Sequence, residues 1–278
     1  MTRRTSRSIA LRPWLAIRRE RPPLLALAAG SVAALFFVLP LVGLLWRAPW
    51  RSVPSDLGSP DVRTALRLSL ETSLAAVALC VLFGLPLAWV LARIDFPGRR
   101  LLRALTVLPM VLPPVVGGIA LIYAFGRRGI IGQYLERWFH IVLPFTTKGA
   151  ILAEAFVAMP FLVITAETAF RSLDRSYEDA ARTLGASRWT VFRRVTLPLA
   201  GPALGAGAVL CWARALGEFG ATITFAGNYP GTTQTMPLAV YLSLESSHPE
   251  TGIVLSLVLL LVSLAVLVGL RDRWLGVS

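Results

Sequence analysis

A few charged side chains inside long apolar segments are the residues of this sequence that could do chemistry. Arg214 and Glu218 are four residues apart, and Glu154 and Glu167 lie in an earlier apolar segment. Residues at i and i+4 share one face of a helix, so Arg214 and Glu218 can pair and lower the cost of two charges in apolar surroundings. Two interpretations stay open for them: pairing alone, or a place beside a conduit or gate. For Glu154 and Glu167 we expect interior pairing with a basic residue.

Patterns for catalysis or metal binding do not occur. The sequence contains no HExxH and no GxSxG motif, and its two histidines, His140 and His248, lie in expected loops. Cys80 and Cys211 lie in separate apolar runs without nearby ligands, which favours core residues over a disulfide or a metal site. Lys148 is the only lysine and does not stand in a GxxxxGK[ST] phosphate-binding loop. We therefore predict no catalytic residue, cofactor site or metal ligand, and no ATPase site, in this chain.

Composition indicates a membrane protein. Of the 278 residues, 55% are hydrophobic and 15% charged, and the mean hydropathy is +0.67. A soluble domain this apolar would aggregate. The net charge of +13 comes from arginines that mostly occupy short gaps between apolar runs. This distribution fits membrane topology rather than binding to nucleic acid.

Six apolar stretches are long enough to cross a hydrocarbon core, which takes about 20 residues. The expected fold is therefore an all-α polytopic bundle of six transmembrane helices. The spans are approximately Leu24 to Trp46, Thr72 to Ala92, Ala104 to Gly126, Gly149 to Phe170, Gly201 to Phe225, and Gly252 to Leu270.

The basic residues set the expected orientation. Nineteen of the 28 Lys and Arg residues fall before the first span, after the second and fourth spans, and at the C-terminus, whereas eight fall in the other connecting segments. Basic loops stay in the cytoplasm, so both termini are expected to be cytoplasmic in a bacterial inner membrane.

The third span contains Pro109, Pro113 and Pro114, followed by Gly117 and Gly118. Each proline lacks a backbone donor, so we expect a kinked or broken helix. Irregular backbone in a membrane lies against protein or water. The span could line a pathway or serve packing alone.

A cytoplasmic segment between the fourth and fifth spans has a helix–glycine–helix pattern. Ser176, with Asp179 three residues later, is expected to cap a first helix, and Gly185 to end it in the left-handed conformation. Ser187 is expected to cap a second helix that closes at Pro198.

The first of these helices carries small residues, Ala180 and Ala181, beside Leu184. Small side chains allow another protein to approach closely, which suits a docking helix. An amphipathic helix lying on lipid headgroups, with Trp189 and Phe192 on one side, fits the same pattern. The residues alone leave both interpretations open.

The run Ala180-Ala181-x-x-x-Gly185, followed by Val195-x-Leu197-Pro198, resembles the EAA motif of binding-protein-dependent ABC importer permeases. In that family this loop docks into a groove of a cytoplasmic ATPase and couples its closure to the membrane helices. The motif's glutamate position is Asp179 here, with Glu178 beside it. The resemblance implies an ATPase-coupling loop at residues 172–198 that includes Glu178, Asp179, Ala180, Ala181, Leu184, Gly185, Leu197 and Pro198.

From about Ser69 onward the chain is similar to the permease subunits of molybdate importers. The similarity rests on Leu108 to Gly117, Gly126 to Gly132, Leu216 to Phe225, and Gly227 to Pro237. It implies a fold like that of type I ABC importer permeases. The kinked backbone, the charged pair with its glycines and the hydroxyls in these stretches give candidate pathway or gate residues, with packing, pairing or an exposed loop as the alternatives, namely Pro113, Pro114, Gly217, Glu218, Phe219, Gly220, Thr222 and Thr224.

The resemblance further implies partners: a second copy of this chain, a pair of cytoplasmic ATPases that bind ATP and Mg²⁺, and a periplasmic molybdate-binding protein. A sulfate or thiosulfate permease is the alternative cargo assignment. An ion-coupled carrier is a weaker one, because such chains usually show an internal repeat and none is seen here.

These expectations divide the chain into four parts: a cytoplasmic Arg-rich tail at 1–23, an additional first span with a periplasmic loop at 24–68, a permease core at 69–270, and a cytoplasmic tail at 271–278.

Overall fold

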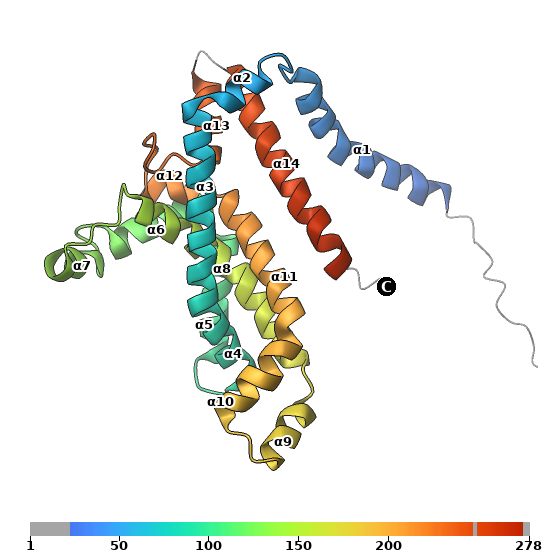
Figure 1. Ribbon diagram of the computed structural model, residues 1–278, viewed down its shortest axis with the longest axis vertical. Coiled ribbons are helices and arrows are strands. Elements are labelled where there is room, and N and C mark those ends of the chain that lie inside the picture. The colour runs from blue at the N-terminus through green and yellow to red at the C-terminus, as the bar shows by residue number, and fades with distance from the viewer. Residues whose placement is uncertain (1–22, 247–248, 275–278) are drawn as a thin grey trace, which may run out of the picture. The chain divides into compact units, whose positions relative to one another are not determined.

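A computed structural model describes residues 23–246 and 249–274, and these residues form helices joined by turns, with no strand among them (Figure 1). The elements are α1 (Leu24–Arg47), α2 (Val53–Gly58), α3 (Pro60–Leu79), η1 (Cys80–Gly84), α4 (Leu85–Arg93), α5 (Arg99–Val111), α6 (Pro114–Phe125), α7 (Gly132–Phe139), α8 (Thr147–Ser172), α9 (Arg175–Thr183), α10 (Arg188–Val191), η2 (Phe192–Thr196), α11 (Leu197–Leu216), α12 (Gly220–Phe225), α13 (Met236–Glu245) and α14 (Pro249–Trp274).

The chain forms two compact units that divide after Trp46. The first unit holds α1, a 24-residue apolar helix with Pro40 inside it, which is long enough to cross a membrane. It coincides with the predicted first span.

The second unit is built around α8. This helix packs against α3, α4 and α11, and its buried side chains are mostly alanine, valine and leucine. One core cluster joins Leu91 of α4, Phe170 of α8 and Leu204 of α11. α8 is therefore the central helix against which α3, α4 and α11 pack.

Small residues allow the long helices to approach closely. Cys80 and Cys211 are both free thiols with no exposed surface, and they pack around Ala155 and Ala158 of α8. A Cβ added at Gly207 would lie 3.0 Å from the Cβ of Thr165 on α8. Membrane helices pack through such small residues because van der Waals contact, rather than the hydrophobic effect, drives their association. The predicted core role of both cysteines is confirmed.

Four helices among the described residues are long and apolar enough to span a membrane: Leu24–Arg47, Pro60–Arg93, Thr147–Ser172 and Arg188–Leu216. The all-α fold is confirmed, but the predicted count of six continuous spans is not. The predicted sixth span lies within α14.

The third predicted span is broken, as its prolines indicated. α5 ends at Val111, Leu112 is extended, and α6 starts at Pro114. The fifth span was predicted to run to Phe225, but α11 ends at Leu216 and the chain bends before the short helix α12. The predicted end was wrong because the glycines on either side of Glu218 and Phe219 interrupt the helix.

Two other boundaries also differ. The second long helix starts at Pro60, so residues 60–68, expected to be loop, form its first turns, capped by the Ser59 side chain. Pro198 does not close the helix after Ser187. The π-helical turn η2 directly precedes this proline, and its wider hydrogen-bond spacing allows the helix to continue although Pro198 has no backbone N–H. The helix therefore runs from Arg188 to Leu216.

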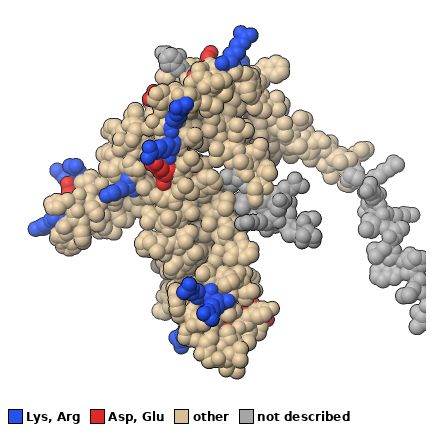
Figure 2. All heavy atoms as spheres, viewed as in Figure 1, with Lys and Arg blue, Asp and Glu red and all other residues tan. Residues whose placement is uncertain are grey.

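On the face shown in Figure 2, charged side chains of the second unit lie over its upper half, at its left extremity and near its lower end, and the surface between the upper and lower groups is mainly uncharged. Exposed apolar side chains include Leu74, Leu82 and Phe83 of the Pro60–Arg93 helix. An apolar belt between charged ends is typical of a membrane-spanning protein.

Candidate functional site

The segment predicted to couple to an ATPase forms a helical hairpin at one extremity of the second unit, where α9 and α10 lie beyond the end of α8 (Figure 1). Gly185 has φ +86°, the left-handed conformation that was predicted. Ser187 caps α10 by accepting a hydrogen bond of 3.2 Å from the Thr190 N–H, which is also as predicted.

The cap of the first helix was predicted wrongly. α9 starts two residues earlier than expected, and Asp174 caps it, because its carboxylate accepts the Ser176 N–H at 2.9 Å. This hydrogen bond lowers the pKa of Asp174 below its usual value. The predicted cap, Ser176, therefore lies inside the helix.

The tip of the hairpin is exposed. The Leu184 side chain is 89% exposed, Asp179, Ala180 and Gly185 are exposed, and Ala181 is half-buried. A Cβ added at Gly185 would meet no atom within 4 Å. The hairpin thus presents small residues and one apolar side chain outward, as a docking surface requires.

Glu178 is the acidic residue that holds the hairpin to the membrane helices. Its carboxylate accepts hydrogen bonds of 2.9 Å from Arg93 at the end of α4 and of 2.9 Å from the Thr196 hydroxyl in η2. The Arg93 and Glu178 side chains are only 9% and 13% exposed. Asp179, at the motif's glutamate position, is 67% exposed and lies 3.5 Å from Arg182. The buried ion pair therefore belongs to Glu178 and not to Asp179.

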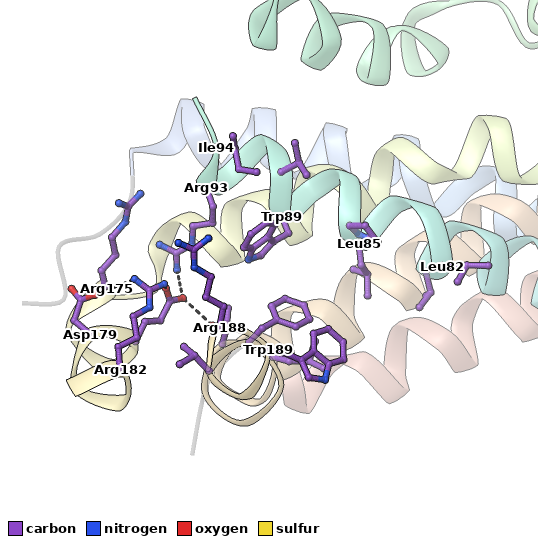
Figure 3. Close-up of a pocket in the computed structure, with 18 residues that line it drawn as sticks. Leu82, Leu85, Trp89, Arg93, Ile94, Arg175, Asp179, Arg182, Arg188 and Trp189 are labelled. Atoms are coloured by element: carbon purple, nitrogen blue, oxygen red, sulfur yellow. Dashed lines mark hydrogen bonds and ion pairs between the residues drawn. The ribbon is translucent and has the colours of Figure 1, made fainter. Parts of the chain in front are cut away.

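An open groove of about 1100 Å³ lies between α4 and the hairpin (Figure 3). Leu85 and Trp89 of α4 form one wall, and Trp189 of α10 lies across the groove. Arg93 closes the end of the groove near Asp179 and Arg182. The hairpin thus contacts α4 mainly at the Arg93 end.

Leu197 and Pro198 follow η2 directly and begin α11. The second helix of the hairpin therefore runs into α11 as one helical segment, Arg188–Leu216. The contacts of Glu178 add a second connection, from the hairpin to α4. A displacement of α9 is expected to move both long helices.

Three of the candidate pathway residues, Pro114, Gly220 and Thr224, come together at a second place, where α6 and α12 pack against each other. A Cβ at Gly220 would lie 2.7 Å from the Cβ of Pro114, and a Cβ at Gly118 would lie 2.6 Å from the Cβ of Thr224. Neither glycine has room for a side chain. The two breaks in the predicted spans, at Pro113 and at Gly217, thus belong to one tightly packed site.

Glu218 lies at this break with 1% of its side chain exposed. It forms an ion pair with Arg214 at 2.6 Å, as its spacing predicted, and accepts the Ala221 N–H of α12 at 2.8 Å. Phe219 packs against Tyr241 with ring centroids 5.1 Å apart. Glu218 therefore stabilises the bend by linking α11 to the start of α12.

The two threonines of α12 differ in environment. Thr222 is completely buried, and its hydroxyl has no hydrogen-bond partner among the described residues. Thr224 donates to the Gly220 carbonyl at 2.7 Å. Gly217 is exposed, and the nearest atom to an added Cβ would be the Ala213 carbonyl oxygen at 3.6 Å.

The remaining interior acids have different partners. Glu167 pairs with Arg171 and with Arg103, whose Nε donates to it at 2.9 Å, so its predicted pairing is confirmed. Glu154 has no ion pair among the described residues, and instead accepts a hydrogen bond from the Thr72 hydroxyl at 2.8 Å. The prediction of a basic partner for Glu154 was wrong, because the Thr72 hydroxyl on α3 donates a hydrogen bond to one of its carboxylate oxygens instead.

Sequence reasoning missed Arg93, Thr196 and Thr72, the partners of Glu178 and Glu154. No motif marks these residues. The separation of 85 residues between Arg93 and Glu178 places their contact beyond any local pattern. The one available signal was that Arg93 is the first charge after a long apolar run.

Residues 81–276 match the family described as binding-protein-dependent transport system inner membrane component. The chain belongs to this family.

Two relatives with named transport systems are similar to this chain over most of its length. The molybdenum transport system permease protein ModB of Mycobacterium tuberculosis (strain ATCC 25618 / H37Rv) is 48% identical over 244 residues, covering 87% of this chain and 92% of the relative. The sulfate transport system permease protein CysT of Escherichia coli (strain K12) is 38% identical over 229 residues, covering 81% and 82%.

The fold is similar to that of a chain in the crystal structure of a bacterial alginate ABC transporter in complex with an alginate pentasaccharide-bound periplasmic protein. The TM-score is 0.69 at 19% identity, and the match covers 90% of this chain and 93% of the other. The structural match shows the fold, and the family membership makes the chain an inner membrane component of a binding-protein-dependent transport system.

Proposed function

We propose that this chain is the permease of an ATP-driven importer that carries molybdate or tungstate from the periplasm to the cytoplasm. The observation that supports this function best is the exposed α9–α10 hairpin, which Glu178 joins to α4 and to η2, directly before α11. A chain that worked without an ATPase would have no use for such a hairpin.

The proposed mechanism is alternating access. ATP and Mg²⁺ bind to a cytoplasmic ATPase pair and not to this chain, and closure of that pair displaces the hairpin of each permease copy. The buried Arg93–Glu178 ion pair passes the displacement to the Pro60–Arg93 helix, and the continuous chain passes it to α11. ATP drives the change only to the extent that it stabilises the outward-open state more than the inward-open state.

The proposed assembly contains two copies of this chain, the ATPase pair and a periplasmic binding protein that delivers the oxyanion. One coupling hairpin per permease chain supports the two-copy arrangement. A periplasmic protein bound to the alginate transporter supports the third partner. Both termini lie in the cytoplasm in this proposal, consistent with the excess of arginines in the segments that would face it.

The α6–α12 contact is the proposed position of the gate. The helices on both sides of the contact are interrupted, at Pro113 and at Gly217, so each can hinge without breaking a long run of backbone hydrogen bonds. The hydroxyls of Thr222, which is buried, and of Thr224, which donates to the Gly220 carbonyl, are the polar side-chain groups of α12 that opening of the contact would expose. Weak polar contacts suit a conduit, which must release its ion.

The assignment of cargo rests on relatives. Identity is 48% to a permease named for molybdenum and 38% to one named for sulfate. Sulfate or thiosulfate is therefore the second candidate. An ion-coupled carrier is less consistent with the structure, since the exposed α9–α10 hairpin would have no role in a chain that works without an ATPase.

Uptake in cells tests the cargo assignment. Cells that lack this chain should lose uptake of labelled molybdate, and a plasmid copy should restore it. Excess unlabelled sulfate should leave the restored uptake unchanged, whereas excess tungstate should inhibit it by competition. If equimolar sulfate abolished uptake, the chain would belong to a sulfate importer.

A further inference from the structure

A second pocket, of about 420 Å³, lies at the end of the second unit where α4 meets α5 and α8 ends. Four arginines line it: Arg99, Arg100, Arg103 and Arg171. The first helix of the coupling hairpin, α9, starts four residues after Arg171, so the pocket lies toward the same membrane surface as the hairpin. No step of the proposed transport mechanism uses these side chains.

The pocket has a surplus of positive charge. Arg99 pairs with Asp95, whereas Arg103 and Arg171 share Glu167. Arg100 has no ion pair among the described residues and is exposed. Four guanidinium groups thus face two carboxylates, which leaves two positive charges uncompensated.

Two of the four guanidinium groups, those of Arg99 and Arg103, are held in place before any ligand arrives. The Leu91 carbonyl near the end of α4 accepts hydrogen bonds from Arg99 at 2.9 Å and from Arg103 at 3.4 Å. Gly98, with φ +87°, makes the turn that directs α5 back past α4. Fixed guanidinium groups lose little freedom on binding, and their planar donors match the oxygens of a phosphate.

The same helix carries an apolar face directly beyond the pocket. Leu101, Leu105 and Leu108 of α5 are 64%, 54% and 43% exposed, and their spacing places them along one side of the helix. Exposed leucines next to a cluster of arginines are typical of a segment at the boundary between acyl chains and headgroups.

From this arrangement we propose that the pocket binds the phosphate group of an anionic phospholipid, with the acyl chains along the leucine face of α5. The chemistry recognised is a phosphate oxyanion, which a free phosphate ion also offers. The leucine face favours the lipid as its source. Basic pockets between membrane helices on the cytoplasmic side are suited to such headgroups. The proposal does not depend on molybdate as cargo.

Native mass spectrometry of the purified full chain tests the site. The probes are phosphatidylglycerol, phosphatidylcholine with the same acyl chains, and inorganic phosphate. The chain should retain phosphatidylglycerol in preference to phosphatidylcholine. Arg100→Gln should weaken this preference about fivefold, as expected for one surface cation. Arg128→Gln, which removes an exposed arginine with no ion pair among the described residues, should leave it unchanged.

The other outcomes distinguish a lipid headgroup from free phosphate as the ligand, and a lipid site from a surface that contacts protein. If free phosphate displaces phosphatidylglycerol and also binds in its absence, and Arg100→Gln weakens both, the pocket binds the ion as well as the lipid. An unchanged preference in both Arg100→Gln and the double variant Arg100→Gln/Arg171→Gln would overturn the proposal. So would loss of a co-purifying ATPase in Arg100→Gln with lipid binding intact, because the pocket would then contact protein. Normal molybdate uptake with lost lipid preference would leave the transport function standing.

Discussion

Replacing Glu178 by glutamine should separate the coupling hairpin from the membrane helices. The substitution keeps the shape of the side chain and removes its charge, so the Arg93 guanidinium would stay buried without its counter-ion. Removing one member of a buried ion pair costs roughly 3–5 kcal/mol. Because Arg93 and Glu178 are still 9% and 13% exposed, we expect the low end of that range, about 3 kcal/mol.

Thermal melting of the purified transporter measures this cost. A loss of about 3 kcal/mol should lower the melting temperature by roughly 6–12 °C, on the scale known for domains of this size. Uptake per ATP hydrolysed should fall as well, since the hairpin would no longer move α4.

A double variant serves as the control. Arg93→Met/Glu178→Leu fills the same space without charge, and should melt close to the unaltered protein, because apolar pairs often replace buried ion pairs without loss of stability. If Glu178→Gln melted normally and transported normally, the connection we assign to this pair would not exist. If the double variant were less stable than either single change, burial of the pair would not be the cause.

Three further predictions concern the hairpin and the α6–α12 contact. Gly185→Asp should abolish co-purification with the ATPase while membrane expression stays normal, because it adds a charge to the exposed tip; Gly185→Asn, which tolerates a φ of +86°, should retain more binding. Gly220→Val should reduce the rate of molybdate uptake strongly, since the new Cβ would lie 2.7 Å from the Cβ of Pro114. Gly217→Ala should leave the uptake rate nearly unchanged, because no atom lies nearer than 3.6 Å to the added Cβ. The lowered pKa of Asp174 means that its cap stabilises α9 above the usual carboxyl pKa and that this stabilisation is lost as pH falls through the lowered value. Protection from hydrogen exchange in the first turn of α9, measured relative to the intrinsic rate at each pH, should therefore fall at acidic pH, and Asp174→Asn should remove this dependence.

Local chemistry predicted much of the fold. Long apolar runs located the helices, and the missing donors of Pro113 and Pro114 predicted the break between α5 and α6. Apolarity alone extended the fifth span through Gly217, because hydropathy does not detect a helix end inside an apolar run. The prediction that Pro198 ends a helix was wrong, since the wide turn of η2 allows the helix to continue through the proline.

The candidate site was predictable in its local parts and not in its contacts. Gly185 and Ser187 act through their own backbone neighbourhood, so their types and spacing were sufficient. The Glu178–Arg93 pair and the Pro114–Gly220 contact join residues far apart in the chain, and only the packing around α8 brings them together.

Reconstitution tests the central claim most directly. The chain and its ATPase would be placed in proteoliposomes, with the periplasmic binding protein and labelled molybdate on the side opposite the ATPase. We predict accumulation of molybdate that requires ATP on the ATPase side and disappears with Gly185→Asp in this chain. Accumulation that continued without ATP, or that Gly185→Asp left unchanged, would contradict the account of an ATP-driven permease coupled through the α9–α10 hairpin.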